Sequence, residues 1–340
     1  MPDKGVVIGV NHYPGHKDLN GSENDATAFH AWLTRVDGGG LATADVKLLL
    51  SSHFAPLAAA APSAKPTSED VRGAFYPLIT EATQSGQAIG DRLFVFFAGH
   101  GIGSVSATSA VGFVHSNSEA VYTLATDVLR YVDWFVRKGA FDSVIFIFDC
   151  CRVIQPTADP VPPMLPVFVP QGAVVKQFNA YATLYGKVAR ERPFPPTNVT
   201  RGYFTKAFLE ALEFAAPNQN GEVTGTGIKD FTHNRIQTFS QNWNDVPVPK
   251  IDADSQADVV FCRRATAPLV ELRLLIPPAA AGHMLTVHDG GPTATPMGNT
   301  PVPAVPPTMT IRLPVGMYKV VLGNKTYPTV QLTGEMDVSL

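Results

Sequence analysis

The stretch Phe141–Arg152, FDSVIFIFDCCR, decides how the rest of this chain folds. Its centre, Val144–Phe148, is a continuous apolar run without polar alternation, which is typical of a strand buried on both faces of a parallel sheet. The run ends abruptly in Asp149, two adjacent cysteines and Arg152. Because open α/β sheets carry their chemistry at the carboxyl ends of the strands, we expect a functional site here.

A second run of the same kind lies upstream at Leu93–Phe97 and ends in Ala-Gly-His-Gly, with His100 as the imidazole. The intervening chain is long enough for one crossover unit, so the two strands can be neighbours. His100 and Cys151 are therefore predicted to lie at the same edge of the sheet.

Strands and helices are predicted to alternate along the first part of the chain, which indicates a mostly parallel α/β sheet with helices on both faces. The further predicted strands are Gly5–Val10, Val46–Leu50, Phe178–Tyr185 and Ala257–Cys262. The predicted helices are one capped by Asn24 or Asp25, one from Thr67 to about Gly86, and Thr126–Lys138, Tyr203–Phe214 and Ile228–Asn242. Loops are expected at Gly101–Ser109, in the Pro-rich stretch after Arg152, and at 186–202.

The pattern changes at about Arg263, where short runs with a period of two are joined by turns. These runs are Leu269–Ile276, Met284–His288, Met309–Leu313, Met317–Leu322, Tyr327–Leu332 and Met336–Leu340, with a long loop from Gly290 to Pro307. They predict a small antiparallel β-sandwich. We therefore expect two domains, residues 1–262 and 263–340.

Composition restricts the possible partners and location. The chain has 340 residues, of which 45% are hydrophobic and 16% charged, and its net charge of −3 gives no reason to expect nucleic acid or an anionic membrane as a partner. The N-terminus lacks the long apolar stretch of a signal peptide. Three cysteines, two of them adjacent, cannot make a disulfide framework, so we expect a cytoplasmic protein in a reducing compartment.

His100 and Cys151 together supply what cysteine proteolysis needs, a thiol and an imidazole to take and return its proton. The backbone amides of Gly101 and Cys151 are the predicted donors to the oxyanion. Taken singly, a buried core cysteine and a capping histidine would be the simpler interpretation. Catalysis is favoured because both residues interrupt buried strands at the same end.

Residues 5–262 resemble the caspase-like cysteine peptidases, in particular the metacaspase and bacterial orthocaspase branch. The segments that carry the resemblance are VVIGVNHY, LNGSENDA, FVFFAGHG, FIFDCCR, NAYATLYG and GYFTKAFLEAL. In that branch the nucleophile stands two residues after the Asp that ends the strand, which selects Cys151. Cys150 is interpreted as a packed small hydrophobe.

The resemblance also implies a substrate preference. In the metacaspase branch, acids line the pocket for the residue before the cleaved bond, and here these would be Asp25 and Asp149. Two carboxylates in a partly buried pocket favour a cation, so we expect cleavage after Arg or Lys. The competing interpretations are that Asp25 caps a helix and that Asp149 is a strand-end carboxylate bonded to backbone.

The chain departs from that family at several positions. Arg152 stands where metacaspases commonly carry His, and Ser22 where many carry Cys. Many metacaspases bind Ca²⁺ through clustered aspartates, but here Glu119 and a lone Asp127 are too few oxygen ligands, so no metal or cofactor is predicted. The C-terminal part is similar to prealbumin-like or PEGA-type repeats, which implies a domain that binds a protein partner or acts as a spacer rather than one that catalyses.

Two alternatives stay open at this stage, a catalytically silent caspase-like scaffold and an exposed thiol that senses redox state. A caspase-like protease with another specificity is a variant of the main hypothesis. The stretch Val153–Val175 contains no Lys or Arg. An enzyme specific for basic residues would therefore act as an intact chain or cut itself between Lys187 and Arg201.

Overall fold

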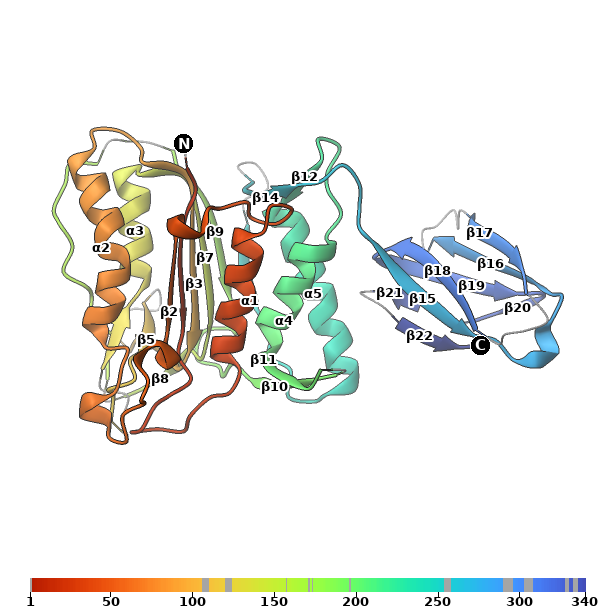
Figure 1. The fold of residues 1–340 in the computed structure, drawn as a ribbon, viewed down its shortest axis with the longest axis horizontal. Helices are drawn as coiled ribbons and strands as arrows, with labels where there is room; N and C mark the ends of the chain where they lie inside the picture. Colours follow the sequence, from red (N-terminus) through yellow and green to blue (C-terminus); the bar gives the residue numbers. More distant parts are fainter. Residues whose placement is uncertain are drawn as a thin grey trace. The chain divides into compact units, whose positions relative to one another are not determined.

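The structure is a computed structural model that describes residues 2–105, 110–119, 124–156, 158–170, 172, 174–195, 197–253, 258–289, 296–302, 308–327, 330–332 and 336–340. The chain divides into two compact units (Figure 1). Residues 1–209 and 224–262 form the first unit, and residues 210–223 and 263–340 form the second. No described helix is long and apolar enough to cross a membrane.

A six-stranded sheet with the order β13-β9-β7-β3-β1-β2 forms the centre of the first unit. All neighbouring strands run parallel except the edge strand β13, which is antiparallel to β9. The strands are β1 (Lys4–Gly9), β2 (Val46–Leu50), β3 (Gly90–Gly99), β7 (Phe141–Cys150), β9 (Lys176–Tyr181) and β13 (Lys250–Ala253). The predicted mostly parallel α/β fold is confirmed.

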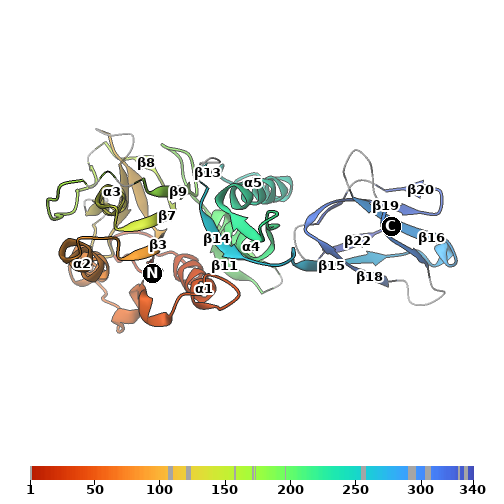
Figure 2. The ribbon, with the colours of Figure 1, turned by 90° about the horizontal axis from the view of Figure 1, so that it is seen from above.

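Helices cover both faces of this sheet, as the view from above shows (Figure 2). One face carries α2 (Ser68–Gln84) and α3 (Leu129–Lys138), and the other carries α1 (Ser22–Thr34), α4 (Tyr203–Phe214) and α5 (Gly225–Asn242). The hydroxyl of Thr67 accepts the amide of Asp70, whose carboxylate in turn accepts the amide of Thr67, so a capping box begins α2. Gly139, in the left-handed conformation with φ 64°, ends α3.

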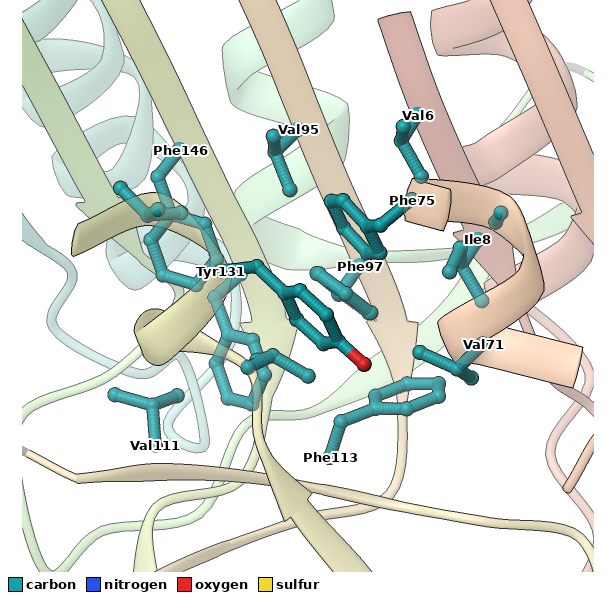
Figure 3. Close-up of a cluster of buried hydrophobic side chains, with 14 of the residues drawn as sticks. Val6, Ile8, Val71, Phe75, Val95, Phe97, Val111, Phe113, Tyr131 and Phe146 are labelled. Carbon is teal, nitrogen blue, oxygen red and sulfur yellow. The ribbon is translucent and has the colours of Figure 1, made fainter. Parts of the chain in front are cut away.

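Aromatic side chains fill the space between β3 and the helices α2 and α3 (Figure 3). The rings of Phe75 and Tyr131 stack with their centroids 4.2 Å apart, and Phe97 lies 4.9 Å from Phe113. On the other face of the same strand, Phe96 stacks on Phe29 of α1 at 4.9 Å. Both faces of β3 are therefore buried, which explains its continuous apolar sequence.

A small sheet with the order β6-β5-β4-β8 extends the strand ends that carry the predicted site. It comprises β4 (Gly101–Gly103), β5 (Val111–Val114), β6 (Ala125–Asp127) and β8 (Val153–Ile154). The predicted loop Gly101–Ser109 is therefore wrong at its start, and 106–109 lie outside the described residues. The predicted helix start at Thr126 is also wrong, because Thr126 pairs with Phe113 in β6 and α3 begins at Leu129.

The segment 186–202 was expected as a loop, but it contains the antiparallel hairpin β10 (Glu191–Phe194) and β11 (Val199–Gly202). The predicted strand through Tyr185 ends at Tyr181. Helix α1 begins at Ser22 after Gly21, so neither Asn24 nor Asp25 is its N-cap. The remaining strands of the region are β12 (Glu222–Thr224) and β14 (Val260–Arg263); the expected Ala257 lies outside the described residues.

The second unit contains two sheets around one apolar core. One has the order β18-β15-β22, and the other has the order β17-β16-β19-β20 with β21 beside β19. The strands are β15 (Leu269–Leu275), β16 (Met284–Asp289), β17 (Pro296–Pro301), β18 (Thr308–Pro314), β19 (Gly316–Leu322), β20 (Lys325–Thr326), β21 (Val330–Leu332) and β22 (Met336–Ser339). Two details differ from expectation: β15 and β22 pair in parallel, and β17 lies within the predicted long loop.

The aromatic core gives a stability prediction. Replacing the fully buried Phe75 by Ala removes a ring that stacks on Tyr131, so the free energy of unfolding is expected to fall by about 3–5 kcal/mol. The neighbouring Tyr76, whose residue surface is 55% exposed, is the matched control, and Tyr76→Ala should cost less than about 1 kcal/mol. Urea unfolding of both variants measures the difference, and equal losses would contradict this packing.

Candidate active site

The pairing register of β3 and β7 brings the predicted histidine and cysteine together. Gly99 is paired with Cys150, so His100 and Cys151 are the next residues on two adjacent parallel strands. Gly101 allows the strand ends to approach closely, because a Cβ at this position would lie 2.5 Å from the carbonyl oxygen of Cys151 and 2.6 Å from the Cβ of Cys150. The two functional side chains therefore share one edge of the sheet.

A cavity of about 330 Å³ opens at this edge. Every residue that the sequence nominated lines it, namely Asp25, His100, Gly101, Asp149 and Cys151. The other lining residues are Leu19, Ser22, Gly99, Val153, Gln155, Val188, Ala189, Arg190 and Glu191. Segments from four parts of the chain thus converge on one small space, as expected for a ligand or substrate site.

His100 is held by the loop that follows β1. Its Nε2 lies 2.7 Å from the carbonyl oxygen of Lys17, its backbone amide donates to the hydroxyl of Tyr13 at 3.0 Å, and its ring centroid lies 4.5 Å from that of Tyr13. Burial lowers the pKa of His100, so the ring is neutral at neutral pH. Because a carbonyl oxygen can only accept, the proton lies on Nε2 and Nδ1 is the basic nitrogen.

Cys151 is half-buried, and its thiol donates to the carbonyl oxygen of Ala189 at 3.7 Å. Burial raises the pKa of this thiol, so it is protonated at neutral pH and needs a base to become a nucleophile. Cys150 is 1% exposed, its thiol lies 3.9 Å from the carbonyl oxygen of Phe97, and burial raises its pKa well above the usual value. Its surroundings fit the predicted role of a packed small hydrophobe. None of the three cysteines forms a disulfide.

Asp149, near the end of β7, bonds to the N-terminus of α4, a helix that begins more than fifty residues later in the sequence. Its Oδ2 accepts the amide of Thr205 at 3.1 Å and the Thr205 hydroxyl at 2.5 Å. These bonds match the backbone-bonded interpretation of this carboxylate, and they stabilise its ionised form. Burial nevertheless raises the pKa of Asp149 to about 6, so the group is charged at neutral pH but not in weak acid.

Asp25 lies in the first turn of α1 and is 2% exposed. Its Oδ2 accepts the amide of Gly202 at 2.7 Å, and its Oδ1 lies 3.5 Å from a guanidinium nitrogen of Arg201. Burial and the neighbouring charge of Asp149 raise the pKa of Asp25 well above its usual value, against the opposing effects of Gly202 and Arg201. The two acids therefore do not both ionise readily at neutral pH.

Sequence reasoning missed Glu191, Gly202 and Thr205. The carboxylate of Glu191 accepts the amides of Asn20 and Gly21 at 3.0 and 2.8 Å, so it joins the hairpin to the start of α1. Thr205 could have been found, because a hydroxyl in the first turn of a predicted helix indicates an anion site. Nothing local to Glu191 or Gly202 indicates that they meet residues about 170 positions earlier in the chain.

Glu119 and Asp127 are the acids in the region where the resemblance to metacaspases implies calcium ligands. The carboxylate of Asp127 accepts the Val111 amide at 3.2 Å and the Arg130 guanidinium at 3.1 Å. Within the described part of the chain, no cluster of three or more His, Cys, Asp or Glu side chains could hold a metal ion.

Gly202 provides a direct test of the acid pair. A Cβ at this position would lie 2.2 Å from Oδ2 and 2.9 Å from Cγ of Asp149, so Gly202→Ala should displace that carboxylate and lower the free energy of unfolding by about 1–3 kcal/mol. Gly73, in α2, has nothing within 4 Å of its ideal Cβ, and Gly73→Ala should be neutral or stabilising by up to about 1 kcal/mol. Denaturant unfolding of the two variants decides; a harmless Gly202→Ala would place Asp149 elsewhere.

Comparisons with known proteins identify the family of this chain. A caspase-domain family model matches residues 3–233. A probable protease from a Desulfuromonadales bacterium is 28% identical over 258 residues, which are 72% of this chain and 29% of that protein, so the chain spans less than a third of this relative.

Two solved structures have TM-scores below 0.5. Caspase-1 from Spodoptera frugiperda is 13% identical with a TM-score of 0.47, over 78% of this chain and 91% of that chain. A structural-genomics protein from Geobacter sulfurreducens is 13% identical with a TM-score of 0.44, over 78% of this chain and 99% of that chain. The conclusion rests on the family model, which matches more than half of the sequence: the chain belongs to the caspase-domain family of cysteine peptidases.

Proposed function

We propose that this chain is a cysteine endopeptidase that hydrolyses peptide bonds after Arg or Lys by a Cys151–His100 dyad. The observation that carries the proposal is a single cavity that contains a thiol, a neutral imidazole and two buried carboxylates. A thiol and a base provide the nucleophile, and buried acids provide a site for a cation.

The proposed reaction begins with transfer of the Cys151 proton to Nδ1 of His100, whose Nε2 is held by the Lys17 carbonyl. The thiolate attacks the substrate carbonyl carbon, and the resulting oxyanion accepts the amides of Gly101 and Cys151. His100 then gives its proton to the leaving amine. Water, with His100 as base, releases the second product from the acyl-enzyme and restores the thiol.

The acids fit a guanidinium better than an ammonium. Gly202 holds Oδ2 of Asp25, whose Oδ1 already lies 3.5 Å from the Arg201 guanidinium, and Thr205 holds Oδ2 of Asp149. Oδ1 of Asp149 is therefore the oxygen that we propose to face a ligand. A guanidinium fork presents parallel donors and can address both carboxylates, whereas an ammonium is a compact point charge. Asp149 supplies the negative charge at neutral pH, and Asp25 supplies a second acceptor. This argument favours Arg over Lys before the cleaved bond.

Three finer parts of the proposal concern processing, partner and place. The guanidinium carbon of Arg192 lies 3.9 Å from the ring centroid of Trp243, and Arg201 donates to the carbonyl of Asn24 in α1. Lys187 and Arg190 are exposed. Within 187–201, we therefore expect self-cleavage at Lys187 or Arg190. Residues 263–340 are proposed to bind a protein partner. A cytoplasmic location stays a proposal based on the cysteine content.

Fluorogenic peptides that differ only in the residue before the cleaved bond test the dyad. Cys151→Ala and His100→Ala are each expected to lower kcat/KM by at least about 10³-fold, because the first removes the nucleophile and the second removes its base. Cys150→Ala is the matched control and should keep most of the activity, since that thiol faces the core. Turnover by Cys151→Ala at the wild-type rate would refute the mechanism.

The pKa of Asp149 gives a pH prediction. The ratio of kcat/KM for an Arg peptide to that for a norleucine peptide should rise as the pH increases through about 6, because the raised pKa keeps Asp149 neutral below that point and charged above it. Titration of His100 affects both peptides alike and cancels in the ratio. Thr205→Val removes a donor to Asp149 and should move the midpoint to higher pH.

A ratio that stays constant between about pH 5 and 8 would contradict the assignment of Asp149 as the charge that binds substrate. A ratio below one in the wild type would contradict basic specificity altogether.

A further inference from the structure

The loop between β1 and α1 surrounds His100, with the ring of His16 at a centroid distance of 6.1 Å and two further groups in closer contact. The carbonyl of Lys17 accepts from Nε2 of His100, and the ring of Tyr13 packs against the imidazole. Both groups belong to one turn, in which the amide of His16 donates to the carbonyl of Tyr13 at 2.8 Å. The shape of this turn therefore determines how His100 is oriented.

Asp18 closes that turn. Its Oδ1 accepts the backbone amide of Tyr13 at 2.6 Å, and its Oδ2 lies 3.2 Å from Nδ1 of His12. Because Asp18 directly follows Lys17, its bond to the Tyr13 amide fixes the distance between Lys17 and Tyr13. A charge-assisted bond of this length is among the stronger ones in proteins.

His12 connects the turn to a second segment of the chain. Its Nδ1 faces the Asp18 carboxylate, and its Nε2 lies 2.7 Å from the carbonyl oxygen of Ala58. Both partners are oxygen acceptors, so a proton on either ring nitrogen has a partner. Its side chain is 17% exposed, which keeps this bridge partly shielded from solvent.

We propose that His12 and Asp18 are positioning residues for His100. Together they form a chain of contacts from the Ala58 carbonyl through His12 and Asp18 to the Tyr13–Lys17 turn, and from there to Nε2 of His100. These contacts hold the proton of His100 on Nε2, so that Nδ1 is the nitrogen that receives the thiol proton. The expected effect on kcat rests on the proposed peptidase function. The expected effect on the His100 tautomer does not.

The simpler alternative is an exposed ion pair that contributes little. The Asp18 side chain is 58% exposed, and isolated pairs of that kind are weak because water and salt screen them. That alternative predicts no change in the His100 tautomer, because it gives the Asp18–Tyr13 bond no role. Asp18 then acts on His100 only through its charge, which raises the pKa of that ring. The two interpretations therefore differ in the tautomer that they predict for the His100 ring when His12 or Asp18 is replaced.

The test compares His12→Gln and Asp18→Ala with Asp18→Asn, which keeps an acceptor for the Tyr13 amide. Two measurements are made on each full-length protein: the ¹⁵N shifts of the His100 ring nitrogens by NMR, which report the tautomer without any turnover, and kcat and KM with the Arg peptide. His53→Gln and Asp37→Asn, at exposed positions, are the matched controls.

We expect His12→Gln and Asp18→Ala to shift the His100 ring away from the Nε2–H form. Both should lower kcat on the order of tenfold or more while KM changes by less than about twofold, because the acids of the cavity are untouched. Asp18→Asn should be milder. The controls should match the wild type in both measurements.

An unchanged His100 tautomer in folded His12→Gln would overturn the proposal, whatever happens to kcat. If Asp18→Ala does not fold, His12→Gln decides, since it leaves the Asp18–Tyr13 bond in place. If the wild type cleaves no peptide, the proposed function fails, while the NMR comparison still decides whether His12 and Asp18 position His100.

Discussion

The parallel pairing of β3 with β7 is the constraint on which the site depends. The two strands have ten residues each, and the register that pairs Gly99 with Cys150 leaves His100 and Cys151 side by side. A slip of one residue would move one side chain about 3.3 Å along the sheet and turn it to the opposite face. The aromatic packing on both faces of β3 makes such a slip costly. The core therefore maintains the relative positions of His100 and Cys151 as well as the stability of the fold.

The buried acids Asp25 and Asp149 are held by hydrogen bonds from backbone amides rather than by strand register. Burying carboxylates is unfavourable, and the raised pKa values of Asp25 and Asp149 show that the cost is only partly offset. The offset comes from backbone: the amide of Gly202 and the first turn of α4 supply donors without any flexible side chain except that of Thr205. A pocket whose acids are held mainly by backbone groups keeps its shape. The guanidinium of Arg201, which is not among the residues that line the cavity, also offsets part of the cost of burying Asp25.

The buried strands could be predicted from the sequence because a strand covered on both faces leaves an uninterrupted apolar run, and the residues ending two such runs identified His100 and Cys151. Thr126 was placed wrongly because its capping potential is local, whereas its pairing with Phe113 is not. The same limit applies to Glu191, whose partners directly precede α1, and to Gly202, whose partner lies in the first turn of α1. Asp25 and Asp149 were nominated by resemblance, since no local pattern brings them to one cavity. Contacts between distant segments need the tertiary fold, and the site consists largely of such contacts.

The acids and the thiol are also coupled to each other. After burial and the Ala189 bond, the negative charge of Asp149 is the next influence on Cys151, and it raises the pKa of the thiol. In the resting site, the group that is proposed to bind the substrate cation therefore adds to the effect of burial, which is the main reason that the thiol is protonated. When a guanidinium lies against Asp149, its positive charge offsets that influence and the thiol proton is easier to transfer to His100. Under the proposed function, a basic residue before the cleaved bond would thus promote formation of the nucleophile as well as binding, and it would act on kcat as well as KM.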